Sequence, residues 1–300
     1  MTRVLFVFLD GVGLGPPTEH NPLHTLDLPA LAALAGGQRW TADAEPVRQP
    51  AHVFVPLDAT LGAEGLPQSG TGQTALFTGV DAVALHGRHY GPYPPTATHE
   101  TLRTDSVYNR LQRNGIESLA FANAYPERFF RAMEARGRWT ATTRMARAAG
   151  VRLRTAADLA IGHALPADIT GERWRRHLDP DHVPVSPAEA GRRLLALARE
   201  CRFTLFEYPY TDTAGHGRDG LRPEHVLPEV DAFLGEILRQ RGETDLLVVS
   251  SDHGNVERPT TKSHTRNPVP LVALGPGAEA FAEATSLLDV TPAIVRALTA

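Results

Sequence analysis

The chain of 300 residues has very little cysteine and lysine, and it has no long apolar run. Its one cysteine, Cys201, excludes an intrachain disulfide bond and fits a reducing compartment. No segment reaches the roughly 20 apolar residues that a membrane-spanning helix needs. Residues 1–10 lack the basic region and the small-residue cleavage site of a signal peptide. We therefore expect a cytoplasmic protein that does not work in a membrane.

The chain also lacks an excess of positive charge. Its net charge of −4 leaves no basic surface for nucleic acid, so phosphate would have to be bound by metal ions or local cations. We expect a small phosphorylated substrate as the partner, and the oligomeric state stays open. Lys262 is the only lysine, and it stands two residues before His264.

Strands and helices alternate along the chain as in an α/β fold with a doubly wound, mostly parallel sheet flanked by helices. Expected strands span 3–9, 52–57, 117–124, 203–208, 245–250 and 270–274, and expected helices span 28–35, 73–77, 105–114, 188–199, 227–239 and 289–298. Residues 126–187 are dense in arginine and show no buried strand. We interpret residues 1–300 as a single core, with 126–187 as a small cap inserted within it.

Acidic residues and histidines stand at the ends of several expected strands, where ligand sites of open α/β sheets lie. They are Asp10 after the first strand, Asp212 and His216 after 203–208, Asp252 and His253 after 245–250, and His264 just before the last strand. Three carboxylates and three imidazoles could hold two divalent ions, Mn or Zn, with positions left open for substrate. Two such ions about 4 Å apart can clamp the attacking and leaving oxygens of a displacement at phosphorus.

Each of these residues also has an ordinary structural interpretation. An aspartate after a strand usually belongs to a turn, and a histidine in a glycine-rich loop is usually solvated. Ser69 stands at the entrance of a helix, where serine is a favoured cap, so it could be a cap or a nucleophile. His86 and His89 could line the same crevice. The joint arrangement at several strand ends is what favours a metal site.

These motifs resemble the alkaline phosphatase superfamily, and within it the metalloenzyme domain of cofactor-independent phosphoglycerate mutases and phosphopentomutases. The resemblance covers roughly 1–85 and 195–300. It is carried by Ser-Asp-His-Gly-Asn-Val-Glu at 251–257, Ser-His-Thr-Arg-Asn-Pro-Val-Pro at 263–270, Asp-Thr-Ala-Gly-His at 212–216 and Ser-Gly-Thr-Gly-Gln at 69–73.

The resemblance implies a two-metal centre with a serine nucleophile that forms a phosphoserine. One metal ion would be held by Asp10, Ser69, Asp252 and His253, and the other by Asp212, His216 and His264. Glu257 would orient the ligands from behind. Lys262, Arg88 and Arg266 are candidates to bind the phosphate oxygens that do not react.

Two departures from the family pattern bear on the activity. The family has Gly-His where this chain has Gly72 and Gln73, and the mutases carry a much larger inserted domain than 126–187. A phosphatase is therefore the favoured function, with a phosphomutase second and a phosphodiesterase as a further alternative. A sulfatase is disfavoured because the Ser69 segment lacks the proline and arginine of that class. The alternative from another class is a non-catalytic metal-binding protein.

Overall fold

The computed structural model describes all 300 residues, which are built around a seven-stranded sheet with the strand order β2-β3-β9-β8-β1-β7-β4. The strands of this sheet are β1 (Arg3–Leu9), β2 (Val47–Gln49), β3 (His52–Leu57), β4 (Leu119–Phe121), β7 (Phe203–Tyr208), β8 (Asp245–Ser250) and β9 (Val269–Leu274). A separate two-stranded sheet pairs β5 (Ala124–Tyr125) with β6 (Arg154–Thr155). None of the helices combines the length and the apolar character that crossing a membrane requires.

The main sheet is mixed but mostly parallel. β1 runs parallel to both β7 and β8, and β4 runs parallel to β7. β9 is antiparallel to β8 and to β3, which therefore points the same way as β8. Only β2 and β9 run against the other strands. The predicted fold class is confirmed.

Fourteen α-helices and three short 3-10 helices surround the sheet. The α-helices are α1 (Pro22–Thr25), α2 (Pro29–Leu34), α3 (Ser69–Thr78), α4 (Ala82–His86), α5 (His99–Thr104), α6 (Val107–Arg113), α7 (Glu127–Arg136), α8 (Ala141–Ala148), α9 (Ala156–Ala160), α10 (Glu172–His177), α11 (Pro187–Arg199), α12 (Tyr210–Gly215), α13 (Pro223–Gln240) and α14 (Val290–Thr299). The 3-10 helices are Thr96–Thr98, Ala278–Phe281 and Leu287–Asp289.

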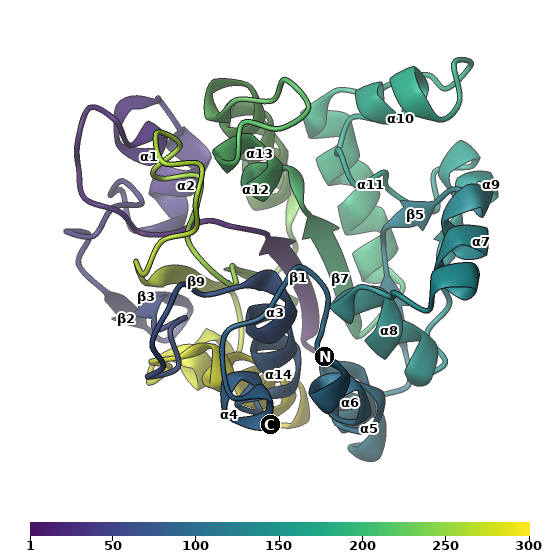
Figure 1. Cartoon of the computed structure of the whole chain (residues 1–300), viewed down its shortest axis with the longest axis horizontal. Coiled ribbons are helices and arrows are strands. Elements are labelled where there is room, and N and C mark those ends of the chain that lie inside the picture. The colour runs from purple at the N-terminus through teal and green to yellow at the C-terminus, as the bar shows by residue number, and fades with distance from the viewer.

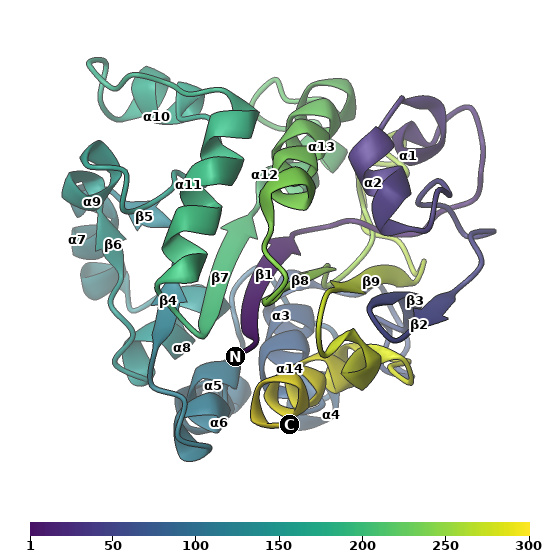
Figure 2. The same ribbon diagram turned by 180° about the vertical axis from the view of Figure 1, so that it is seen from behind.

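Both faces of the sheet are buried beneath helices, which gives the molecule two hydrophobic cores. Successive side chains of a strand point to opposite faces. In β1, Val4, Phe6 and Phe8 enter the core shared with α3, α6, α8 and α14. The alternate residues of β1 enter the core shared with α2, α11 and α13. Figure 2 shows α11 and α13 running across this second face. The apolar, non-alternating sequence of β1 thus follows from burial on both sides.

The expected strand 117–124 is interrupted in the structure. β4 ends at Phe121, and Asn123 then bonds through its side chain to the backbone of Glu207 in β7. Its Nδ2 donates to the Glu207 carbonyl (2.7 Å), and its Oδ1 accepts from the Glu207 N–H (2.8 Å). The amide side chain thereby makes the bonds that a strand backbone would make, so the backbone is free to turn away toward β5.

Three expected helices differ clearly at their ends. The helix expected at 73–77 is α3, which begins at Ser69. The helix expected at 105–114 begins at Val107, because the Ser106 hydroxyl accepts from the backbone of Asn109 and caps it. The helix expected at 227–239 begins earlier, with Pro223 in its first turn. Proline is tolerated there because its missing N–H would have no helical partner.

The arginine-rich segment 126–187 holds α7 to α10 and the short strand β6. α8 packs into the first core through Met145 and Ala146. Ala124, Leu159, Ala164 and Trp174 form a small cluster of their own near α9 and α10. Figure 1 shows α7, α9 and α10 together at one side of the molecule, beyond α11.

Candidate metal centre

The structure brings the predicted ligands to one edge of the sheet. Asp10 follows β1, Asp252 and His253 follow β8, and Asp212 lies on α12 after β7. His264 precedes its strand instead of following it. Because β9 runs antiparallel to β8, the beginning of β9 lies at the edge where β8 ends. His264 therefore reaches the same edge as the residues that follow their strands.

The first cluster of ligand atoms gathers around Nε2 of His253. This nitrogen lies 3.3 Å from Oδ1 of Asp10 and 3.6 Å from Oδ2 of Asp252. The hydroxyl oxygen of Ser69 lies 3.0 Å from the same nitrogen. The ligand atoms of the two aspartates and His253 all fall within 4.8 Å of one another, which suits one ion.

The second cluster gathers around Oδ1 of Asp212. This oxygen lies 3.4 Å from Nε2 of His216 and 3.4 Å from Nε2 of His264, and these two nitrogens are 3.1 Å apart. The His264 ring stacks on His253 with centroids 3.8 Å apart, so the two clusters adjoin.

Backbone carbonyls set the tautomers of the two histidines of the second cluster. Nδ1 of His216 donates to the Lys262 carbonyl (2.9 Å), and Nδ1 of His264 donates to the Pro67 carbonyl (2.7 Å). Each ring therefore turns its Nε2 lone pair toward Asp212, which is the arrangement that metal-binding histidines adopt.

Each buried carboxylate of the first cluster has one oxygen that accepts no hydrogen bond, although Nε2 of His253 lies nearby. Oδ1 of Asp10 and Oδ2 of Asp252 are buried and accept no hydrogen bond. Buried polar atoms are normally satisfied, and a buried charge is normally paired or bound to a metal. A divalent cation would supply the missing partner, so these residues fit a metal ion.

The shifted pKa values of the carboxyl groups and of His253 also indicate that positive charge stabilises these clusters. Burial, together with the charge of Asp252, raises the pKa of Asp10 to about 8, and burial raises the pKa of Asp252 as well. Burial alone would lower the pKa of His253, but the two carboxylates outweigh it and raise this pKa to about 10. Burial works against ionisation of Asp212 too, but the charge of His253 and the hydrogen bond from the Asn255 amide hold its pKa below the usual range.

Of the two interpretations of Ser69, the helix cap does not hold in the structure. The N-cap position is taken by Gln68, whose side chain makes no capping bond, and Ser69 is the first helical residue. Its hydroxyl points to His253 instead of to the N–H groups of its own helix. Gly72 permits this approach, because a Cβ atom there would lie 2.8 Å from the carbonyl oxygen of Asp252. The serine hydroxyl is therefore available for a ligand or a reaction.

Two amide side chains that sequence reasoning had not assigned to the site also contact the ligands. Nδ2 of Asn255 donates to Oδ1 of Asp212 (2.6 Å), and Nε2 of Gln73 donates to Oδ2 of Asp10 (3.4 Å). Gln73 had been noted only as a departure from the family pattern. In the structure it supports a metal-cluster carboxylate.

Glu257 ties three loops of the site together. Its Oε2 accepts from the backbone N–H groups of Gly13 (3.0 Å) and Asn255 (2.8 Å). Its Oε1 accepts from the Thr265 hydroxyl and from Nδ2 of Asn267 (2.9 Å). The loops after β1 and β8 and before β9 are thus fixed to one buried carboxylate. This geometry suits a residue that orients ligands without binding the metal itself.

A further buried carboxylate, Glu207, lies beside Asp10. Thr142 on α8 donates to its Oε2 (2.6 Å). Burial raises the pKa of Glu207 to about 7 against that hydrogen bond, and the charge of Asp10 adds to the rise. Sequence reasoning missed this residue; the available signal was a single acid within the apolar strand 203–208.

The three predicted phosphate-binding cations are not gathered into one cluster. Arg266 donates to the backbone carbonyls of Ala63 (3.2 Å) and Gly65. Lys262 is exposed, and its carbonyl bonds His216. Arg88 is exposed and forms no hydrogen bond or ion pair.

The two histidines that were left undecided also have contacts of their own. His86 packs edge-on against Tyr90, with ring centroids 4.8 Å apart. His89 lies near Arg266, and burial together with that charge lowers its pKa. Neither ring takes part in the two metal clusters.

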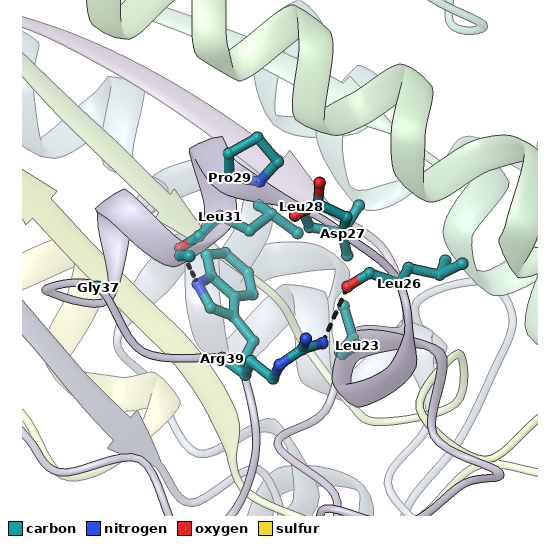
Figure 3. Close-up of a pocket in the computed structure, with 10 residues that line it drawn as sticks. Leu23, Leu26, Asp27, Leu28, Pro29, Leu31, Gly37 and Arg39 are labelled. Carbon is teal, nitrogen blue, oxygen red and sulfur yellow. Dashed lines mark hydrogen bonds between the residues drawn. The ribbon is translucent and has the colours of Figure 1, made fainter.

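Another hollow, of about 230 Å³, lies at α1 and α2, apart from these clusters (Figure 3). The side chains of Arg39 and Trp40 in it are already bonded. Arg39 donates to the carbonyls of Leu26 (3.0 Å) and His24, and the Trp40 indole donates to the Leu31 carbonyl (2.7 Å). No unsatisfied polar group from these residues faces the hollow, so it is not a candidate site.

Comparison with known proteins finds a family profile that matches the C-terminal part of the chain. A family profile described as Metalloenzyme superfamily matches residues 185–300. A phosphopentomutase of Methylobacterium radiotolerans is 42% identical over 66 residues, which are 22% of this chain and 16% of that protein. A 2,3-bisphosphoglycerate-independent phosphoglycerate mutase of Vibrio vulnificus is 28% identical over 121 residues, which are 37% of this chain and 24% of that protein. The matches thus span less than a quarter of each of these relatives.

A solved structure extends the likeness to the whole chain at the level of the fold. Alkaline phosphatase from the Antarctic bacterium TAB5 aligns with a TM-score of 0.52 and 14% identity, over 99% of this chain and 98% of that one. The matches confirm the resemblance that the motifs predict: residues 185–300 match the Metalloenzyme superfamily profile, and the fold of the chain is similar to that of an alkaline phosphatase.

Proposed function

We propose that this protein is a two-metal-dependent phosphoryl-transfer enzyme for small phosphorylated substrates, with Ser69 as the nucleophile. The observation that carries the proposal is the position of the Ser69 hydroxyl, 3.0 Å from His253, in a cluster where two buried carboxylate oxygens accept no hydrogen bond. A structural serine would cap its helix, whereas this hydroxyl is turned to the ligand cluster.

The residues divide into two ligand sets. Asp10, Ser69, Asp252 and His253 would hold one ion, and Asp212, His216 and His264 would hold the other. Bound divalent ions would supply positive charge for the phosphate and lower the pKa of a hydroxyl or water that they bind. Mixed aspartate and histidine ligands accept both Mn and Zn.

Ser69 would attack phosphorus, forming a bond from its oxygen to phosphorus as the bond to the leaving oxygen breaks. The backbone N–H groups in the first turn of α3 favour the negative charge of the phosphoryl group there. Asn255 and Gln73 would keep Asp212 and Asp10 in position. Glu257 would hold the three loops that carry the ligands.

Hydrolysis of the phosphoserine would give a phosphatase, which we favour. Residues 126–187 would form a small cap within a single core of 1–300, and such a cap encloses less of a substrate than the large inserted domain of the mutases. A phosphomutase is the second candidate, because the curated relatives are a phosphopentomutase and a phosphoglycerate mutase. The single cysteine is consistent with work in the cytoplasm.

One set of assays separates the candidates. The protein, loaded with Mn or Zn, is given phenyl phosphate, a phosphopentose, 3-phosphoglycerate and a phosphodiester. We expect release of inorganic phosphate from monoesters. Isomer formation without phosphate release would instead indicate a mutase, and cleavage of the diester alone would indicate a phosphodiesterase. Stoichiometric metal without turnover of any substrate would overturn the proposal in favour of a metal-binding protein.

A further inference from the structure

A hollow of about 520 Å³ lies between the loop 90–96 and the segment 137–144 that leads into α8. We call it the Arg144 pocket. Its side chains include Tyr90, Tyr93, His99, Arg138, Trp139 and Arg144. None of the known motifs of the chain falls within it.

One wall of the Arg144 pocket is attached to the helix that carries Ser69. The Thr71 N–H donates to the Tyr90 carbonyl (2.9 Å). Gly70 lies so close to the loop that a Cβ atom there would be 2.2 Å from the carbonyl oxygen of Tyr93. The loop that lines the pocket therefore lies against the residues that directly follow the proposed nucleophile.

The opposite wall is formed by Gly137, Arg138 and Trp139, which precede α8, and by Arg144 in α8 itself. A ligand between the two walls would thus lie beside the loop that packs against the first turn of α3.

The pocket is cationic and has no counter-ion. No aspartate or glutamate lines it, and neither Arg138 nor Arg144 forms an ion pair. Nε of Arg144 is buried and has no hydrogen-bond partner, and one Nη makes only a long bond to the Gly137 carbonyl (3.4 Å). A half-buried guanidinium whose Nε–H is buried without a partner is costly, and its planar fork matches a carboxylate or a phosphate. The aromatic walls suit the apolar body that would carry such a group.

We propose that the Arg144 pocket binds a second anionic group of the substrate, a carboxylate or a further phosphate, at the end remote from the phosphoester that reacts with Ser69. The inference rests on the proposed function and makes it more specific. The preferred substrates would be small phosphoesters with two anionic ends, held by Arg144 and Arg138 at one end and by the metal centre at the other.

The test compares substrates that differ only at the remote end. These are phenyl phosphate, 4-carboxyphenyl phosphate and 1,4-phenylene bisphosphate. We expect kcat/KM to be about 10- to 100-fold higher for an anionic substrate than for phenyl phosphate, as one buried charge-assisted contact allows. The two anionic substrates separate a carboxylate preference from a phosphate preference. Equal kcat/KM for all three would overturn the proposal.

Substitutions test whether the preference for anionic substrates arises in the Arg144 pocket. Arg144→Met should bring the ratio between anionic and neutral substrate close to one, and Arg144→Lys should restore part of it. Arg136→Met is the matched control, because Arg136 is exposed at the end of α7 and does not line the pocket. It should leave the ratio unchanged. A preference that survives Arg144→Met in a folded protein would contradict the assignment.

A binding measurement separates this inference from the proposed function. Benzylphosphonate and 4-carboxybenzylphosphonate cannot be hydrolysed, and calorimetry compares their affinities for the metal-loaded protein. Tighter binding of the carboxylated compound that is lost in Arg144→Met supports the pocket even if no phosphoester is turned over. Turnover of phenyl phosphate with equal binding of both phosphonates would overturn the pocket and leave the proposed function standing.

Discussion

The hydroxyl oxygen of Ser69 lies 3.0 Å from Nε2 of His253, although 184 positions of the chain separate the two residues. The contact joins the first turn of α3 to the turn after β8. It exists because Gln68, and not Ser69, occupies the N-cap of α3. Ser69 therefore does not cap the helix, although a serine at this position of the sequence commonly would. A substitution of Ser69 can thus change activity without changing the stability of α3.

Ser69→Ala should abolish phosphoryl transfer without unfolding the protein. We expect kcat to fall by at least about 10³-fold, as when other nucleophiles are removed. The melting temperature should change little, because no capping bond is lost. Ser186→Ala is the opposite control, since the Ser186 hydroxyl accepts from the Glu189 N–H and caps α11. That variant should lose about 1 kcal/mol of stability and keep its activity. An unchanged rate in Ser69→Ala would remove the nucleophile assignment.

His264→Ala should empty one of the two proposed ion sites. It removes the imidazole whose Nε2 lies 3.4 Å from Asp212 and 3.1 Å from His216. Native mass spectrometry should find one ion fewer per chain than in the unchanged protein. His225→Ala is the control, because His225 is exposed on α13. Chelation of the unchanged protein should lower its unfolding free energy by about 2.7 kcal/mol for each occupied site, relative to metal at one hundred times its Kd. Identical metal content in both variants would contradict the second cluster.

Glu257→Gln should weaken metal binding indirectly, because Glu257 holds the loops that carry the metal ligands. Each carboxylate oxygen of Glu257 accepts two hydrogen bonds. The NH₂ group of a glutamine would replace one of these oxygens and would face two donors. In one orientation the donors are Gly13 and Asn255, and in the other they are Thr265 and Asn267. We expect a 10- to 100-fold loss of metal affinity and about 2 to 4 kcal/mol of destabilisation. Metal titration and urea unfolding measure the two effects. Glu279→Gln, at an exposed position, should change neither.

The ligand clusters could be predicted because their residues sit in short motifs directly beside strand ends. Asp252 and His253 follow an apolar run, and their placement needs only the rule that sites lie beyond strand ends. The rule alone does not predict the position of His264, because this residue precedes its strand. It reaches the site through the antiparallel direction of β9, which the sequence pattern did not reveal.

The remaining contacts depend on side-chain direction and on packing between distant segments. The Ser69 hydroxyl could as well have capped α3, and only the helix boundary at Gln68 decides between the two. Glu207 looked like one polar residue in a strand, and its importance depends on Thr142 from a segment with no motif. The Arg144 pocket likewise forms between a proline-rich loop and α8, which no local pattern connects.

Glu229→Gln should reduce the loss of stability at high pH. Glu229 lies on α13, where its Oε1 is buried without a partner. Burial raises its pKa from 4.5 to about 7, and the charge of Asp168 adds to the rise against hydrogen bonds from Thr170. The folded state therefore holds this proton more tightly than the unfolded state. The stabilising contribution is fully present below pH 4.5 and is lost as the pH rises through about 7, at a total cost of at most about 3 kcal/mol. Glutamine does not titrate, so the variant escapes this cost.

Urea unfolding at pH 5 and at pH 8, with chelator present throughout, measures the effect. The drop in unfolding free energy between the two pH values should be smaller in Glu229→Gln than in the unchanged protein, by about 1 to 3 kcal/mol. Glu224→Gln is the matched control, because Glu224 lies exposed in the first turn of the same helix. It should keep the full pH dependence, since every other titrating group is retained. If the unfolding free energy fell equally in Glu229→Gln and in the unchanged protein, the Glu229 carboxylate would already be solvated. Its burial beside Asp168 would then not limit stability at high pH.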